Sequence, residues 1–187
     1  MGKIPDDAKC VFKGILFEVY QWEQKMFDNS YQTFERVKRL NSSQIICVTE
    51  NNKIIVLEEE QPGRDKFTGL VGGMIERKEK PEENAKKELL EETGMVCENL
   101  KLWKVDSMGG KINWDTYYFI AKNCKKIQDP KPENGERIII KEVNFDQFLE
   151  EVEKTTFRNK NFRDMIFRMR HTKGEIEKLE KKLFEND

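Results

Sequence analysis

The chain has 187 residues, with 34 basic and 35 acidic side chains and a formal net charge of −1 at pH 7. Its length allows one substantial hydrophobic core but is short for two independent domains, and its balanced charge excludes a global positive field for nucleic acid or an anionic membrane. Since the four cysteines form no C-x-x-C pair and no apolar run approaches a membrane span, we expect a cytoplasmic protein with free thiols, built as one domain with attached arms.

The first third of the chain predicts β-strands. Residues 11–20 are rich in β-branched and aromatic side chains, the Asp-Asn-Ser sequence at 28–30 is typical of a turn, and residues 31–40 partly alternate between apolar and polar. We therefore expect residues 1–42 to form an N-terminal arm of antiparallel strands, and residues 43–187 to form the main domain.

A second strand pair is predicted at 44–49 and 54–58, joined by a turn at 50–53. Both runs are continuously apolar, as expected for strands that are buried on two faces at the centre of a sheet. A proline- and glycine-bearing loop follows at 61–73.

A helix is predicted at about 81–93. Pro81 suits the first helical position, and Gly94 suits the residue after the last turn. Glu82 and Glu83 favour the positive end of the helix dipole.

The remaining elements include both strands and helices. Strands are predicted at 100–105, 116–121 and 137–143, the first two joined by a glycine-bearing loop at 107–114. Asn144 is a candidate N-cap for a helix, and one final helical stretch carries six apolar residues at helical spacing: Phe162, Ile166, Met169, Ile176, Leu179 and Leu183. We expect an α+β fold with a mixed central sheet.

Three glutamates, Glu88, Glu91 and Glu92, share one face of the predicted helix, because spacings of three and four residues fall within an arc of about 100°. Carboxylates crowded beside a glycine loop repel one another unless a cation neutralises them. Hard oxygen ligands suit Mg²⁺ or Mn²⁺, whose remaining positions go to water and substrate phosphate oxygens. The pattern predicts a divalent metal site for phosphate chemistry, although the glutamates alone are equally compatible with a solvated helix face.

The segment 73–95 is similar to the signature of the Nudix hydrolases, G-x5-E-x7-R-E-U-x-E-E-x-G-U, where U is aliphatic. Eight positions match in register: Gly73, Glu79, Glu88, Leu89, Glu91, Glu92, Gly94 and Met95. Lys87 departs, because the signature has arginine there. A match at this many fixed positions is far more specific than a short glycine motif, so the chain is identified as a member of the family, which implies an α/β/α sandwich.

The resemblance implies a role for each matching position. In the family, the glutamates at the positions of Glu88, Glu91 and Glu92 bind the catalytic metal, and the backbone carbonyl at the position of Gly72 often joins them. The family arginine pairs with an acid of the signature and fixes its orientation. Lys87 keeps the charge but loses the planar, two-pronged geometry, which predicts a weaker contribution to catalysis.

The wider sequence resembles the ADP-ribose and ADP-sugar pyrophosphatases of this family. In that group an acid from the loop before the penultimate strand is the catalytic base, which corresponds best to Glu136 and next to Glu133; Glu88 is the alternative, as in other branches of the family. The N-terminal strands of the group commonly build a homodimer, which is therefore expected here, with an extension of the same sheet as the alternative.

Four residues are candidates for binding the substrate. Arg64 is suited to contact phosphate or transition-state charge, and Gly73 lets the backbone approach the ligand closely. Trp114 and Phe17 are candidates for stacking on an adenine-like ring. The alternatives are a solvated loop arginine and aromatic side chains that belong to the core.

The expected function is hydrolysis of the pyrophosphate bond in a nucleotide-linked small molecule, with Mg²⁺ as cofactor and Mn²⁺ as a substitute. ADP-ribose or another ADP-sugar would give AMP and a sugar phosphate. Residues 68–73 lack the E-L-P-A-G pattern usual in the ADP-ribose group, so a pyrophosphatase for nucleoside triphosphates or dinucleoside polyphosphates stays open as an alternative. Lys87 in place of the arginine keeps a second alternative open, a non-catalytic nucleotide-binding module. Neither nucleic acid nor a membrane is expected as a partner.

Overall fold

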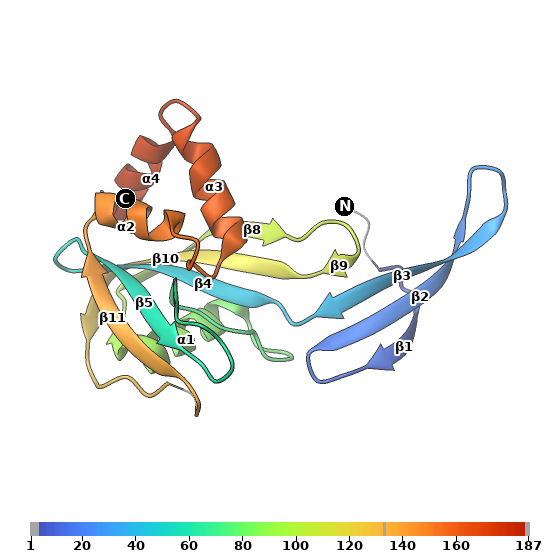
Figure 1. Cartoon of the computed structure of the whole chain (residues 1–187), viewed down its shortest axis with the longest axis horizontal. Coiled ribbons are helices and arrows are strands. Elements are labelled where there is room, and N and C mark those ends of the chain that lie inside the picture. The colour runs from blue at the N-terminus through green and yellow to red at the C-terminus, as the bar shows by residue number, and fades with distance from the viewer. Residues whose placement is uncertain (1–3, 133, 186–187) are drawn as a thin grey trace.

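The computed structural model describes residues 4–132 and 134–185. A twisted sheet with helices on both sides forms the main body, and a smaller sheet extends from it as an arm (Figure 1). The prediction of an α+β fold with a mixed central sheet is confirmed, because this sheet contains both parallel and antiparallel strand pairs.

Seven strands form the central sheet. Five follow the order β11-β5-β4-β10-β7, with β6 beside β5 and β8 beside β10. Their bounds are β4 (Ser42–Thr49), β5 (Ile54–Glu60), β6 (Phe67–Gly69), β7 (Met95–Val96), β8 (Asn99–Ser107), β10 (Asp115–Lys126) and β11 (Arg137–Val143). The sheet contains all five strands predicted beyond residue 43: 44–49, 54–58, 100–105, 116–121 and 137–143.

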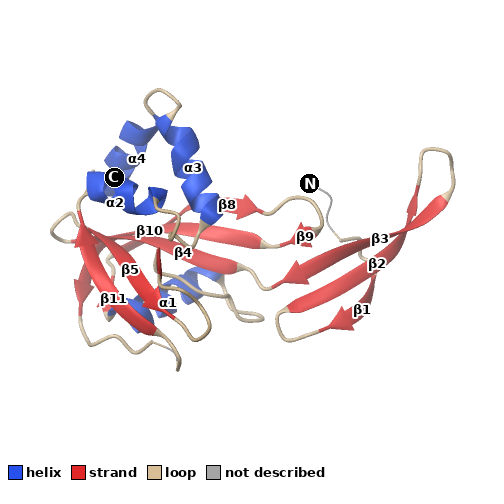
Figure 2. Cartoon of the chain, viewed as in Figure 1, coloured by secondary structure: helices blue, strands red, loops and turns tan. Residues whose placement is uncertain are grey.

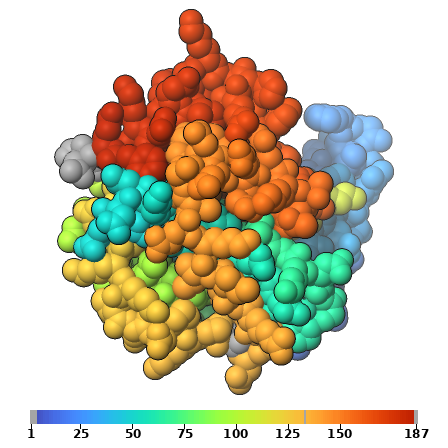
Figure 3. Space-filling model, turned by 60° about the vertical axis from the view of Figure 1, so that its left-hand side comes forward, coloured from blue at the N-terminus to red at the C-terminus, as the bar shows by residue number. Residues whose placement is uncertain are grey.

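Four helices cover this sheet (Figure 2). The bounds are α1 (Pro81–Thr93), α2 (Phe145–Glu153), α3 (Lys160–Arg170) and α4 (Glu175–Phe184). Helix α1 lies on one face, and α2, α3 and α4 lie together on the other. Seen from another side, the C-terminal helices (red) cover the upper part of the molecule, and the arm (blue) lies behind the main body (Figure 3).

Both faces of the central sheet are buried, which explains the continuous apolar runs in the sequence. Ile46 and Val48 of β4 belong to the core with α2, α3 and α4, where they share a cluster with Phe148. Their neighbours Ile45 and Cys47 belong to the core on the α1 side. Alternate residues of one strand therefore supply two different hydrophobic layers.

Local sequence sets the ends of the helices. Helix α1 has proline in its first turn and ends at Gly94, whose φ of 70° is left-handed. Helix α2 begins with a capping box, in which the Asn144 side chain accepts a hydrogen bond from the Gln147 N–H, and the Gln147 side chain accepts one from the Asn144 N–H. Both boundaries agree with the sequence prediction.

Two predictions about the length of elements are wrong. Residues 11–20 form no single strand, because a turn at Gly14 separates β1 (Lys9–Lys13) from β2 (Phe17–Lys25). The final helical stretch is two helices, because Gly174, with a φ of 80°, interrupts the chain between α3 and α4.

The arm is a four-stranded sheet in the order β1-β2-β3-β9. Strand β3 (Tyr31–Arg39) pairs antiparallel with β2, and β9 (Ile112–Asn113), which lies within the predicted loop at 107–114, pairs in parallel with β3. None of the described arm residues is buried, and several large apolar side chains are exposed: Val11, Phe12, Phe17, Tyr31 and Phe34. The arm sheet therefore has no hydrophobic core of its own.

All four cysteines are free thiols: Cys10 is exposed, Cys97 is half-buried, and Cys47 and Cys124 are buried. Within the described ranges, no helix is long and apolar enough to cross a membrane.

Candidate active site

The glycines before α1 let the chain pass close to β4. The Ile45 N–H donates to the Val71 carbonyl at 2.8 Å and the Ser43 N–H donates to the Gly73 carbonyl at 3.0 Å, so residues 71–73 lie along the strand. Between them, Gly72 has a φ of 146°, and a Cβ atom there would collide with the Ser43 carbonyl. Only glycine fits this position without displacing β4.

This path brings the glycine backbone to the glutamates of α1. Glu92 is only 7% exposed, and its carboxylate accepts a hydrogen bond from the Gly72 N–H at 2.8 Å. The Glu88 carboxyl lies directly against Gly73, where any side chain would collide with it. The glycine segment and the acidic helix face therefore form one structural unit.

Together they line a cavity of about 210 Å³, here called the carboxylate pocket. Its lining includes all the predicted metal ligands and two further predicted site residues: Glu88, Glu91, Glu92, Gly72, Gly73 and Lys87. Glu136, the predicted base, lines the same pocket from the residue before β11, and its carboxylate accepts a hydrogen bond from Gln61 Nε2 at 2.8 Å. The structure thus brings together acids from two segments that lie far apart in the sequence.

Burial raises the pKa of two acids at this site, Glu92 and Glu59. Desolvation raises the pKa of Glu92 well above its usual range, and the nearby carboxylates of Glu59, Glu88 and Glu136 add to this, against the hydrogen bond from Gly72. Desolvation also raises the pKa of Glu59, which is 4% exposed, to about 7. No lysine or arginine of the described chain lies within ion-pair distance of Glu92.

The chemistry of the pocket fits a divalent cation. Carboxylate and carbonyl oxygens are the ligands that Mg²⁺ and Mn²⁺ prefer, and a cation would offset the charge of the buried Glu92 carboxylate. In the part of the chain that the structure describes, no three ligating side chains already enclose one point, so the acids line a pocket rather than a preformed coordination shell. The groups that would hold the ion are Glu88, Glu91, Glu92 and the Gly72 carbonyl.

Lys87, which replaces the arginine of the signature, pairs with an acid of the same segment. Its Nζ lies 3.3 Å from Glu76 Oε1, in a partly exposed pair that contributes little free energy. The loop before α1 is instead fixed by the buried Asn84, whose Nδ2 donates to the Met74 carbonyl at 2.9 Å and to the Glu79 carboxylate at 3.0 Å. The sequence carries no signal for Asn84, because asparagines are mostly exposed.

Two further charged residues belong to this site, although neither was predicted. Glu59 continues the buried face of β5 after Ile55 and Leu57, so the period of two along the strand is a signal that identifies it. Arg158 lines the carboxylate pocket, and its Nη1 lies 3.5 Å from Glu59 Oε2. No local pattern marks Arg158, which comes from the turn between α2 and α3.

The other predicted residues lie outside the carboxylate pocket. Arg64 is exposed in the loop after β5, and Phe17 is 45% exposed at the start of β2. Trp114 precedes β10, and the guanidinium of Arg39 lies 4.2 Å over its ring. Glu133 lies outside the described residues.

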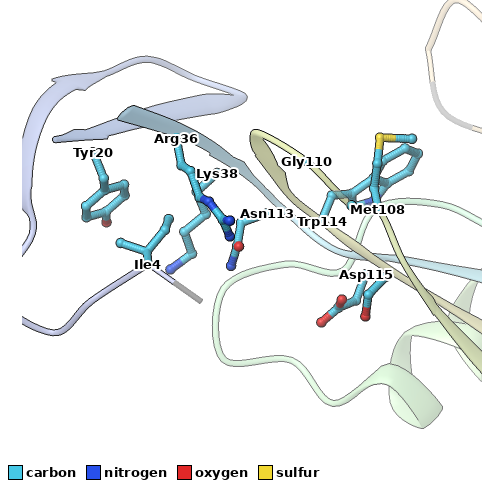
Figure 4. A pocket seen from close by; sticks show the side chains of 11 residues that line it. Ile4, Tyr20, Arg36, Lys38, Met108, Gly110, Asn113, Trp114 and Asp115 are labelled. Carbon is cyan, nitrogen blue, oxygen red and sulfur yellow. The ribbon is translucent and has the colours of Figure 1, made fainter. Parts of the chain in front are cut away.

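A larger cavity, of about 570 Å³, lies between the arm and the main body (Figure 4). Tyr20, Arg36 and Lys38 line it from the arm, and Trp114 and Asp115 line it from the main body. This cavity offers aromatic and cationic surface but none of the clustered glutamates, so the smaller carboxylate pocket is the candidate for the chemistry.

Comparisons with known proteins agree with this geometry. The profile of the NUDIX domain matches residues 39–166. The chain is 24% identical over 147 residues to the ADP-ribose pyrophosphatase of Bacillus subtilis (strain 168), covering 78% of this chain and 74% of that protein. It is 23% identical over 162 residues to the methanol dehydrogenase activator of Bacillus methanolicus, covering 82% and 87%. A crystal structure of an ADP compounds hydrolase matches with a TM-score of 0.71 and 18% identity, covering 89% of this chain and 91% of that one, which shows a shared fold.

Proposed function

Because this chain belongs to the NUDIX domain family and is a Nudix hydrolase of phosphoanhydride bonds, we propose that its substrate is ADP-ribose or another ADP-sugar, which it cleaves to AMP and a sugar phosphate. The observation that carries the proposal is the carboxylate pocket, where three glutamates of α1, the Gly72 backbone and Glu136 line one cavity. An acidic site of this kind binds a diphosphate through a divalent cation.

In this proposal Mg²⁺, or Mn²⁺ in its place, is bound by Glu88, Glu91, Glu92 and the Gly72 carbonyl. When bound, such an ion neutralises phosphate charge and makes water more acidic. The hydrogen bond from the Gly72 N–H fixes the Glu92 carboxylate at 2.8 Å, and the rigid helix α1 orients the other two acids.

Glu136 is the general base in this proposal. It lines the pocket from a different element than the metal ligands, and the hydrogen bond from Gln61 at 2.8 Å holds its carboxylate in place. The water oxygen forms a bond to phosphorus while Glu136 accepts the water proton, and the bond from phosphorus to the bridging oxygen breaks. The leaving phosphate keeps that electron pair. Glu133, which lies outside the described residues, is the second candidate from the same loop, and Glu88 is the alternative base.

The choice of an ADP-sugar draws on two observations. One relative of this chain is named ADP-ribose pyrophosphatase. In addition, the carboxylate pocket is not isolated: Trp114 lines both the cavity beside the arm and a cavity that adjoins the carboxylate pocket. A substrate with one group on each side of its diphosphate is therefore favoured over a triphosphate.

We also propose that residues 1–42 are a dimerisation arm, attached to a Nudix domain at 43–187 whose signature spans 73–95. The arm exposes 57% of Phe12 and 40% of Phe34, and exposed apolar surface of this kind is typical of an interface. A second copy of the chain, related by two-fold symmetry, would bury it.

A panel of nucleotides tests the function. The full chain is incubated with Mg²⁺ or Mn²⁺ and with ADP-ribose, ADP-glucose, ATP or diadenosine polyphosphate, and the products are separated by chromatography. We expect equal amounts of AMP and sugar phosphate from the ADP-sugars, with turnover lost in EDTA. Faster cleavage of ATP or of the dinucleotide would favour the alternative pyrophosphatase, and no turnover of any compound would contradict the proposal.

A further inference from the structure

A second cavity, of about 340 Å³, adjoins the carboxylate pocket. The two share a wall formed by Gly72, Gly73, Met74 and Arg158. The rest of its lining includes Arg39, Trp114 and the first residues of α3, so we call it the arginine pocket. A group bound there would lie next to a phosphate held by the acids of α1.

Arg39 enters this pocket from the end of β3. It is half-buried, its guanidinium lies 4.2 Å over the Trp114 ring, and no carboxylate of the described residues lies within ion-pair distance of it. Desolvation and the positive charge of Arg158 both lower the pKa of Arg39, yet an arginine in a protein stays protonated. The contact with tryptophan offsets only part of the cost of removing this cation from water.

Arg158 enters the pocket from the turn between α2 and α3, far from Arg39 in the sequence. Its backbone is fixed to β6, because the Thr68 N–H donates to the Thr156 carbonyl at 3.1 Å and the Arg158 N–H donates to the Thr68 carbonyl at 2.8 Å. Its guanidinium lies 5.0 Å from the centre of the Phe67 ring and makes one long contact, 3.5 Å, to the carboxylate of Glu59. The remaining N–H groups make no other hydrogen bond to the described residues.

Two arginines from distant segments thus face one cavity although like charges repel, which is expected where an anion belongs between them. The N-terminal end of α3, with Asn159, Lys160 and Asn161, lines the same cavity and adds the positive end of a helix dipole. We infer that the carboxylate pocket holds the phosphate that water attacks, and that the arginine pocket binds the other phosphate of the diphosphate, which becomes the leaving group when the bridging bond breaks. This inference rests on the proposed function, which identifies the anion as a phosphate. The ligand class expected in the arginine pocket is therefore a phosphomonoester.

Binding measured without metal tests this inference separately from turnover. Calorimetric titrations in EDTA compare AMP with adenosine, and ribose 5-phosphate with ribose, so that each pair isolates the phosphate. We expect the phosphate to strengthen binding about 10-fold or more, as charge-assisted hydrogen bonds do, and we expect Arg158→Met and Arg39→Met to remove this gain. If the gain is the same in wild type and in both variants, or if the phosphate adds nothing in wild type, the arginine pocket is not a phosphate site.

A matched variant separates the pocket from general effects. Arg168→Met removes the same charge from an exposed position on α3 and should leave the phosphate-dependent gain unchanged. If Arg158→Met does not fold, Arg39→Met carries the test. If the wild-type chain binds phosphate in this arginine-dependent way but cleaves no compound of the nucleotide panel, the proposed function is contradicted and the phosphate site is still supported.

Steady-state kinetics give a second readout. A group that holds the leaving phosphate equally in substrate and transition state changes KM rather than kcat. We therefore expect Arg158→Met to raise KM for ADP-ribose about 10-fold, with kcat changed by less than about 3-fold, and Arg158→Lys to recover part of the loss. A loss confined to kcat, with KM unchanged, would contradict the assignment.

Discussion

The central sheet and the arm are both β-sheets, yet in the described chain only the central sheet is covered by a hydrophobic core. Strand β4 buries seven of its eight residues between two helical layers, whereas strand β1 buries none. Burial of apolar surface supplies most of the free energy that favours folding. The main body therefore has its own hydrophobic core, whereas the arm exposes apolar surface that the proposed dimer would cover.

This difference separates two properties of the molecule. The carboxylate pocket is lined by the glycine segment before α1, by α1 itself, by the residues before β11 and by Arg158, all in or beside the well-packed main body. Catalysis should therefore respond to substitutions in the main body and at Arg39, where β3 meets it, and self-association should respond to substitutions elsewhere in the arm.

Glu92→Gln should have the largest effect on turnover. The amide can still accept the Gly72 hydrogen bond, but it cannot supply the charge that holds a divalent cation. We expect kcat to fall by at least ~100-fold, with the oligomeric state little changed.

Glu83→Gln, on the exposed face of the same helix, is the matched control for this substitution and should keep turnover within about 2-fold. Near-wild-type rates of Glu92→Gln at saturating Mg²⁺ would defeat the role assigned to Glu92.

Glu59→Gln should change how stability depends on pH. The pKa of Glu59 is raised to about 7 in the folded state, above its ordinary value of 4.5, so the folded protein binds this proton more tightly than the unfolded chain. The favourable contribution is complete below about pH 4.5 and is lost as pH rises through 7. Glu59→Gln should therefore be more stable than wild type at pH 8, by on the order of 2–3 kcal/mol, with little difference near pH 4.5.

Urea unfolding in EDTA at both pH values measures this effect. Glu35→Gln, on the exposed surface of β3, should change stability by less than about 0.5 kcal/mol at either pH. A constant difference between Glu59→Gln and wild type at both pH values would argue against a buried, titrating carboxyl at Glu59.

Charges introduced on the arm should break self-association. Phe12→Glu combined with Phe34→Glu places carboxylates on the exposed apolar surface, where burial against a second copy would be costly. We expect the dissociation constant of the dimer, from analytical ultracentrifugation, to rise at least ~10-fold.

Ile127→Glu provides the control, since it changes an equally exposed apolar residue of the main body and should leave the dimer intact. A wild-type chain that sediments as a monomer, or a double variant that dimerises as before, would show that the arm serves another purpose.

Lys87→Arg should have the smallest effect. The pair with Glu76 is partly exposed, so replacing the ammonium with a guanidinium should preserve kcat or raise it by up to about 3-fold. A large loss of kcat would show that lysine is specifically adapted to this position.

The parts of the fold that the sequence predicts best are those set by neighbouring residues. Helix α1 starts and ends as predicted, because proline and glycine act within one turn, and β11 coincides with the predicted 137–143. The pairing of β9 with β3 and the separation of α3 from α4 at Gly174 were not predicted, since the first depends on distant contacts and the second on a glycine within a continuous helical pattern.

The same distinction holds for the site. Spacing places Glu88, Glu91 and Glu92 on one face of a helix, and the resemblance to the Nudix signature is what predicts them as metal ligands. Glu59 was missed although it follows the alternation of β5, because an acid at a buried strand position runs against ordinary burial preferences. Arg158 cannot be predicted from its neighbours, because hydrogen bonds to β6, far away in the sequence, bring it to the pocket.

The most direct test of the central claim is a crystal structure of the full chain with Mn²⁺ and a non-hydrolysable ADP-ribose analogue, in which anomalous scattering locates the ion. We predict the ion among Glu88, Glu91, Glu92 and the Gly72 carbonyl, with an oxygen of the diphosphate as a further ligand. An ion bound elsewhere, with these glutamates turned to solvent, would contradict the account.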